Sequence, residues 1–283
     1  MLKGYIFIIS AAICWGFIGI FSFIAFSQGV EPMEVAFWRA LLAWLFFGSQ
    51  ALLRKEIHLV PRDIPLLVLF GLLGISLFYV SYLYAVKNGG AAFASILLYT
   101  APVWVVVCSF FIYREKLTSS KILAVVLVIV GVFLISKTGG NSNSTRAVGA
   151  ITILAGLTSG FCYSLYYTIG KYFSSRYSSA NIFLYVLPIG VLGILPAVDF
   201  VHKSPLAWVA LILVSLVSTF IANHCYYLGL QYLEAGKASI AATLEPVVAA
   251  IAAYFILGEY FTILGYFGVG MIVTAVILTI LKE

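Results

Sequence analysis

Long apolar runs separated by short polar gaps make up almost the whole chain. Each run holds about 20 residues, the length that an α-helix needs to cross the roughly 30 Å hydrocarbon core of a bilayer. No run alternates with a period of two, so the pattern predicts helices rather than the strands of a membrane barrel. The ten predicted spans are residues 5–26, 33–53, 64–86, 91–112, 119–136, 148–170, 181–198, 206–230, 236–257 and 262–281.

The composition agrees with a fold that lies almost entirely in lipid. Hydrophobic residues make up 63% of the 283 residues and charged residues 9%, whereas soluble domains hold roughly 45–50% and 25%. A water-soluble fold of this size could not cover so much apolar surface, and the short gaps leave no room for a further soluble domain. The sequence therefore predicts an all-α membrane protein.

The basic residues, which give a net charge of +6, stand in short clusters between the runs. They form no extended stripe, so they indicate membrane orientation rather than nucleic-acid binding. With the N-terminus in the cytoplasm, the cytoplasmic gaps hold Lys3, Arg54, Lys55, Arg62, Arg114, Lys116, Lys121, Lys171, Arg176, Lys237 and Lys282, against Lys87, Lys137, Arg146 and Lys203 outside. Because cytoplasmic loops carry an excess of Lys and Arg, we expect both termini in the cytoplasm.

One internal repeat organises the chain. Short motifs recur at an offset of 144 residues: Ala94-Ser95-Ile96 with Ala238-Ser239-Ile240, Pro102-Val103 with Pro246-Val247, Phe111-Ile112 with Phe255-Ile256, and Glu115 and Thr118 with Glu259 and Thr262. We therefore expect a first repeat at 1–138, a polar linker at 139–147 and a second repeat at 148–283. Because each repeat holds five spans, the second enters the membrane from the opposite side. Such inverted repeats are typical of secondary transporters, with substrate bound between the halves near the midplane.

These motifs resemble the drug/metabolite transporter superfamily, in its EamA-type branch of two five-helix repeats. The resemblance rests on Ala94 through Pro102-Val103 to Glu115, Ala238 through Glu245-Pro246-Val247 to Gly258-Glu259, and Phe37-Trp38-Arg39-Ala40-Leu41. It covers essentially the whole chain and implies a central cavity between spans one to four and six to nine, with spans five and ten at the periphery. It also implies transport of a small metabolite, in a bacterial or archaeal cell membrane, without identifying which metabolite.

Two charged residues lie more than one helical turn inside predicted spans. Glu245 lies about ten residues into its span, roughly 15 Å deep and so near the midplane. A carboxylate at that depth is costly and is a candidate for substrate or proton handling; the alternative is a structural hydrogen bond where Pro246 disrupts the helix. Its equivalent in the first repeat is Ala101. Arg39 lies about six residues inside its span, where it suits either a clamp for a ligand carboxylate or an interfacial arginine.

Aromatic and polar side chains gather at mid-depth in several spans. At helical spacing they form faces that suit either the wall of a cavity or hydrogen bonds between helices. His224 could relay protons with Glu245, or it could be a neutral hydrogen-bonded histidine. The candidate substrate-binding residues are Trp15, Arg39, Tyr79, Tyr82, Tyr99, Tyr163, Asn223, Tyr227 and Glu245.

The sequence thus predicts a secondary transporter that exports an amino acid or a related compound by alternating access, with proton coupling at Glu245 and His224. The alternative is uptake of a quaternary amine or another small solute, because aromatic rings with one carboxylate suit a cation. The sequence does not favour an intramembrane enzyme, because it contains no His-Glu-x-x-His motif and its four cysteines lie in apolar runs without the spacing of metal ligands. We expect no cofactor and no metal. The peripheral Gly265, Gly268 and Gly270 suit a homodimer contact.

Overall fold

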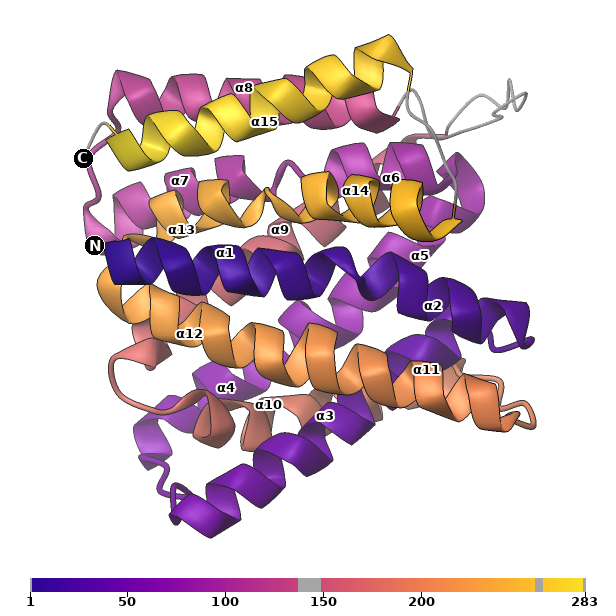
Figure 1. Cartoon of the computed structure of the whole chain (residues 1–283). Helices are drawn as coiled ribbons and strands as arrows, with labels where there is room; N and C mark the ends of the chain where they lie inside the picture. The colour runs from indigo at the N-terminus through magenta and orange to yellow at the C-terminus, as the bar shows by residue number, and fades with distance from the viewer. Residues whose placement is uncertain (1, 137–148, 258–261, 282–283) are drawn as a thin grey trace.

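The structure, a computed structural model, describes residues 2–136, 149–257 and 262–281. These residues form helices and no strand, and the helices run along and against one common direction (Figure 1). Nine helical segments among them are long and apolar enough to cross a membrane, and one shorter apolar helix, Ser119–Ile135, completes a set of ten. The prediction of an all-α fold with ten spans is therefore confirmed, and the predicted linker lies outside the described residues.

Each half contributes five spans, several of them interrupted. The first half contains α1 and α2 (Leu2–Gly16, Ile18–Ser27), α3 (Pro32–Arg54), α4, η2 and α5 (Ile64–Phe70, Gly71–Leu77, Phe78–Gly89), α6 and α7 (Ala91–Leu98, Ala101–Tyr113) and α8 (Ser119–Ser136). The second contains α9 (Ala150–Ser174), α10 (Ser179–Ile194), α11, η4 and α12 (Pro205–Ser215, Leu216–Ile221, Ala222–Tyr232), α13 and α14 (Ala235–Ala242, Glu245–Leu257) and α15 (Ile263–Leu281).

The interruptions follow the sequence repeat. The π-helical segments η2 and η4 end at Leu77 and Ile221, and 221 − 77 = 144. The break between α6 and α7 follows Leu98, and the break between α13 and α14 follows Ala242, again 144 residues later. These two irregularities therefore occur in both halves, as expected for two copies of one ancestral unit, whereas the break between α1 and α2 has no counterpart in the continuous helix α9.

The two halves interleave rather than standing side by side. Spans of one half pack against spans of the other. Two pairs join equivalent spans, α3 with α10 and α8 with α15, and the other two, α1 with α12 and α5 with α9, correspond to each other under the 144-residue offset. The α8 and α15 pair lies at one edge of the bundle (Figure 1), which is the peripheral place expected for spans five and ten. Packing of helices of one half between helices of the other agrees with an inverted repeat.

Glycines allow α8 and α15 to approach closely. A Cβ added at Gly268 would lie 2.4 Å from the carbonyl oxygen of Gly131, so any larger side chain there would push the helices apart. On the same helix, a Cβ at Gly270 would have no neighbour within 4 Å. Gly268 thus packs against α8 of its own chain, and Gly270 lies on the open face of this pair.

A proline in α10 leaves one backbone carbonyl without its helical hydrogen bond, and a side chain of the other half donates to that carbonyl. Pro188 lies inside α10 and has no N–H, so the carbonyl of Leu184 four residues earlier loses its usual partner. The indole Nε1–H of Trp44 on α3 donates to that carbonyl oxygen at 3.0 Å. The cross-half pair of α3 and α10 is therefore held by a specific hydrogen bond as well as by packing.

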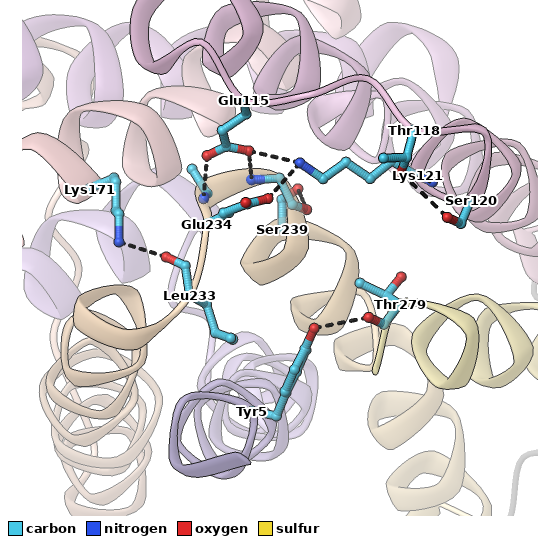
Figure 2. Close-up of polar contacts among 12 residues, drawn as sticks. Tyr5, Glu115, Thr118, Ser120, Lys121, Lys171, Leu233, Glu234, Ser239 and Thr279 are labelled. Carbon is cyan, nitrogen blue, oxygen red and sulfur yellow. Dashed lines mark hydrogen bonds and ion pairs between the residues drawn. The ribbon is translucent and has the colours of Figure 1, made fainter. Parts of the chain in front are cut away.

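Two ends of the bundle are distinguished below. The proximal end is where α1 begins and α15 ends, and there the Tyr5 hydroxyl donates to the Thr279 carbonyl oxygen at 3.0 Å (Figures 1 and 2). The distal end holds the turns from α2 to α3 and from α10 to α11. At the proximal end Thr118 caps α8, since its Oγ1 accepts from the Lys121 N–H at 3.3 Å.

Candidate functional site

A cavity of about 220 Å³ lies between the two halves. Its deeper wall comes from α1, α5, α9, η4, α12 and α14, and its lining continues past Ser22 to Phe26 and Pro32 beside the turn from α2 to α3. The cavity therefore extends from the middle of the bundle toward the distal end. This is the position that the inverted repeat predicts for a substrate site.

Glu245 lines this cavity at the first position of α14. The break after α13 places its carboxylate at the start of a helix, where free N–H groups and the helix dipole favour a negative charge. The Tyr163 hydroxyl on α9 donates to Glu245 Oε2 at 3.2 Å. The carboxylate is thus held by the fold while one side remains accessible from the cavity.

Arg39 on α3 lines the same cavity and is fixed by η4. Its Nε donates to Thr219 Oγ1 at 2.7 Å, and its Nη2 donates to the Ser218 carbonyl oxygen at 3.3 Å. Arg39 and Glu245 therefore present a guanidinium and a carboxyl group to the same cavity.

Aromatic rings form much of the remaining wall. Four of the candidate residues contribute rings to this wall, namely Trp15, Tyr79, Tyr82 and Tyr163. Phe78, which the sequence analysis missed, stacks on Tyr82 with ring centroids 6.1 Å apart and on Tyr163 with centroids 5.7 Å apart. Its position four residues before Tyr82, on the same helical face, is a signal that could have identified it.

Asn223 on α12 adds an amide to the wall. Its Nδ2 donates to the Thr219 carbonyl oxygen at 2.8 Å, whereas its buried Oδ1 accepts no hydrogen bond from any described residue. A buried acceptor without a partner is costly, so a bound donor group would be favoured there. Asn223 and Glu245 thus supply acceptors, and Arg39 supplies donors.

Three of the candidate residues do not line the cavity. Tyr99 packs against the cluster between α8 and α15, although it is an electrostatic neighbour of Glu245. Tyr227 is buried, and its ring packs on Phe183. His224 Nδ1 lies 2.8 Å from the Ser179 hydroxyl on α10. The structure therefore brings His224 to Ser179 and not into the cavity beside Glu245.

Buried tyrosines close the cavity on the proximal side. Tyr167 and Tyr226 are 3% and 0% exposed, and their ring centroids are 5.2 Å apart. Tyr226 also packs on Trp15 at 5.3 Å and on Tyr227 at 5.6 Å. This aromatic layer separates the cavity from the proximal end of the bundle.

Beyond the aromatic layer, charged residues join the halves at the proximal end. Glu115, Lys121 and Glu234, called here the proximal cluster, meet where α7 ends and α13 begins (Figure 2). Lys121 Nζ lies 3.2 Å from Glu115 Oε2 and 2.7 Å from Glu234 Oε2. Burial alone would raise the pKa of Glu234, but its hydrogen bond to Lys121 and the Lys121 charge outweigh burial and hold that pKa below its ordinary value.

A second ion pair joins the halves at the distal end. Glu34 on α3 pairs with Lys203, which precedes α11. The Glu34 carboxylate also accepts from the Trp38 indole at 3.1 Å and from the Val201 N–H at 3.2 Å. The Lys203 ammonium lies 5.3 Å from the Trp38 ring centroid. With side-chain exposures of 0% for Glu34 and 7% for Lys203, this pair is dry.

No group of three or more His, Cys, Asp or Glu side chains that could hold a metal ion occurs within residues 2–136, 149–257 and 262–281. The charged groups described above pair with one another or point into the cavity. Their arrangement can bind and orient a polar solute.

Comparisons with known proteins agree with this geometry. The sequence profile of the EamA-like transporter family matches residues 2–137 and 150–281. An uncharacterized transporter of Archaeoglobus fulgidus is 26% identical over 98% of this chain and 96% of its own length. The uncharacterized inner membrane transporter YicL of Salmonella typhimurium is 24% identical over 98% of this chain and 94% of its own.

A solved crystal structure shares the fold. Its TM-score is 0.85 and its sequence identity 15%, and the match covers 100% of this chain and 98% of that one. At this identity the likeness concerns the arrangement of the helices alone.

Proposed function

Since the chain belongs to the EamA-like transporter family and is therefore a membrane transporter, we propose that it exports an amino acid or a closely related zwitterion by alternating access. The observation that carries the proposal is that Arg39 and Glu245 line the same cavity. A guanidinium binds a carboxylate through charge-assisted hydrogen bonds, and a carboxylate binds an ammonium group in the same way. A molecule with both groups satisfies both residues at once.

The size and lining of the cavity support a small solute. Its volume of about 220 Å³ lies below the roughly 300–1,000 Å³ typical of pockets for drug-sized ligands. The rings of Trp15, Phe78 and Tyr82 offer apolar surface to a side chain. The free Asn223 Oδ1 supplies a further acceptor for an ammonium group.

The second candidate function is uptake of a quaternary amine. The aromatic wall with Glu245 favours it, because such rings attract a cation through their faces. A quaternary amine has no need of Arg39, however, whereas a zwitterion uses both charges. This difference separates the two candidates.

Binding to purified protein tests the proposal. A ligand that binds only the folded state raises its melting temperature, so the standard L-amino acids and choline are compared by thermal shift. For a zwitterion we expect Arg39→Gln and Glu245→Gln each to abolish the shift given by the best amino acid, while Tyr185→Phe, a hydroxyl outside the cavity, keeps it. A shift given by choline alone, lost in Glu245→Gln and kept in Arg39→Gln, would overturn amino-acid binding in favour of the alternative.

Orientation, membrane and coupling belong to the same proposal. We place the protein in a prokaryotic cell membrane with both termini in the cytoplasm, so the cavity faces outward. In a cysteine-free background, Lys87→Cys should react with an impermeant reagent on intact cells, and Lys116→Cys only after permeabilisation. Proton coupling through Glu245 predicts that an imposed pH gradient drives transport in vesicles and that Glu245→Gln removes this effect.

A homodimer through the peripheral spans is the proposed assembly. The open face of α15 around Gly270 includes Phe267 and Thr274, and it borders a cavity of about 470 Å³. Gly270→Leu should shift a crosslinked dimer to monomer if this face is the contact. An unchanged dimer fraction would exclude it.

A further inference from the structure

The proximal cluster joins the two halves through the start of a helix. Glu115 lies in the first half, between α7 and α8, whereas Glu234 and α13 belong to the second half. Glu115 Oε1 accepts from the Ala235 N–H at 2.9 Å, and Oε2 accepts from the Gly236 N–H at 3.3 Å (Figure 2). A carboxylate from one repeat thus caps α13 of the other, while Lys121 bridges the two glutamates.

These contacts are strong because of where they lie. Glu115 and Lys121 side chains are 8% and 7% exposed, so water screens their attraction weakly. Hydrogen bonds from backbone N–H groups to a carboxylate are charge-assisted, and the dipole of α13 adds to them. The cluster therefore holds the start of α13 against the end of α7.

The cluster also stands at the closed end of the transport path. The cavity extends toward the distal end, and the aromatic layer of Tyr167 and Tyr226 lies between it and the cluster. A solute leaving the cavity toward the proximal end must pass between the halves that the cluster joins. Separation of α7 from α13 would open that route.

Hydration distinguishes the proximal cluster from the distal pair of Glu34 and Lys203. Glu234 is 47% exposed, and the cluster borders a cavity of about 640 Å³ whose lining also includes the charged side chains of Lys116 and Lys171. Water can therefore replace these ion pairs when they separate. The distal pair is dry and ringed by aromatic side chains, so its separation would leave buried charges without partners.

We propose that the proximal cluster of Glu115, Lys121 and Glu234 is the gate that keeps the proximal end closed in this conformation and breaks when the cavity opens to that side. The proposal rests on alternating access in the proposed function, but it does not depend on which solute is carried. The distal pair of Glu34 and Lys203 stays intact in both conformations. The gate is therefore one-sided.

Accessibility of a buried residue tests the gate without any substrate. Ser239 on α13 is 0% exposed, and its hydroxyl donates to the Gly236 carbonyl oxygen beside the cluster (Figure 2). In a background where the four cysteines are replaced by alanine, Ser239→Cys is labelled with an impermeant maleimide from the proximal side of vesicles. We expect Lys121→Gln to raise the labelling rate about tenfold or more, because it removes charge-assisted contacts from the closed state only.

Three variants decide the outcome. Glu234→Gln leaves Lys121 paired with Glu115, so it should fold normally and raise the rate by a smaller factor. The double variant Glu34→Gln with Lys203→Gln removes the other cross-half pair without leaving a buried charge, and it should leave the rate unchanged. An unchanged rate in both Lys121→Gln and Glu234→Gln, at unaltered melting temperature, would overturn the gate, as would an equal rise in the double variant. Because no solute is added, the labelling assay and the thermal-shift assay can fail independently. Amino-acid binding can be refuted while the gate is supported, and the gate can be refuted while amino-acid binding is supported.

Discussion

Replacing Glu245 by glutamine separates a need for charge from a need for shape. The glutamine side chain has nearly the same size and can still accept from the Tyr163 hydroxyl, which lies 3.2 Å from Oε2 in the native protein. A hydrogen bond to a charged group contributes about 1.5–3 kcal/mol. At 1.36 kcal/mol for each factor of ten, the loss of the charged contact weakens amino-acid binding by about 10- to 150-fold.

The companion variant Tyr163→Phe leaves the charge and removes only the donor. A neutral hydroxyl contributes about 0.5–1.5 kcal/mol, so binding should weaken by about 2- to 10-fold. Tyr185→Phe is the matched control, because its hydroxyl donates to the Ile57 carbonyl oxygen at 2.6 Å away from the cavity. It should change neither binding nor transport.

The assay is uptake of radiolabelled amino acid into reconstituted vesicles, with affinity measured by calorimetry on the same preparations. Each variant is compared at matched protein amount and melting temperature. Native affinity and full transport in Glu245→Gln across the pH range would refute the reasoning and remove this residue from the mechanism. A loss in Tyr163→Phe larger than in Glu245→Gln would instead assign the main contact to the tyrosine.

Three further predictions concern stability. Gly268→Ala should lower the melting temperature, because a Cβ there would lie 2.4 Å from a backbone oxygen and overpacking costs about 1–3 kcal/mol. Gly270→Ala, on the open face, should leave the melting temperature unchanged. Equal effects of the two variants would contradict the close approach of α8 and α15. Tyr227→Phe should leave the melting temperature unchanged or raise it by a few degrees, since the buried Tyr227 hydroxyl has no hydrogen-bond partner among the described residues. A lower melting temperature would show that this hydroxyl binds water or substrate. Lys203→Met should destabilise the protein by about 3–5 kcal/mol, because it leaves Glu34 buried and unpaired. Adding Glu34→Gln should restore most of the lost stability. If stability does not recover, the broken ion pair is not the cause of the destabilisation.

Local pattern alone determined the spans and the repeat. A helix in lipid satisfies its backbone within itself, so its length and ends follow from the run of apolar residues. The described residues accordingly form nine long spans and one shorter apolar helix. The depth of Glu245 and Arg39 follows from counting residues along a span, and both indeed line the cavity. The breaks after α6 and α13 fall at equivalent places because the repeated motifs determine them.

Only the tertiary structure decided which neighbour each helical face meets. Tyr227 is four residues after Asn223 and shares its face, yet it lies one turn deeper, in the aromatic layer rather than on the cavity wall. His224 faces Ser179 on α10, and Gly268 faces Gly131 of its own chain. Each extra residue in the π segment η4 also rotates the following face by about 100° relative to a regular helix.

The proximal cluster shows why such contacts escape the sequence. The sequence repeat places Glu115 just after the fourth span. Its hydrogen-bond donors, however, are the backbone N–H groups of Ala235 and Gly236, 120 and 121 residues later in the chain. Backbone groups leave no mark in a residue pattern, and helix packing in lipid depends on shape rather than on hydrophobicity. The sequence therefore determined which residues could act at each depth, and the packing of the interleaved halves decided which of them meet.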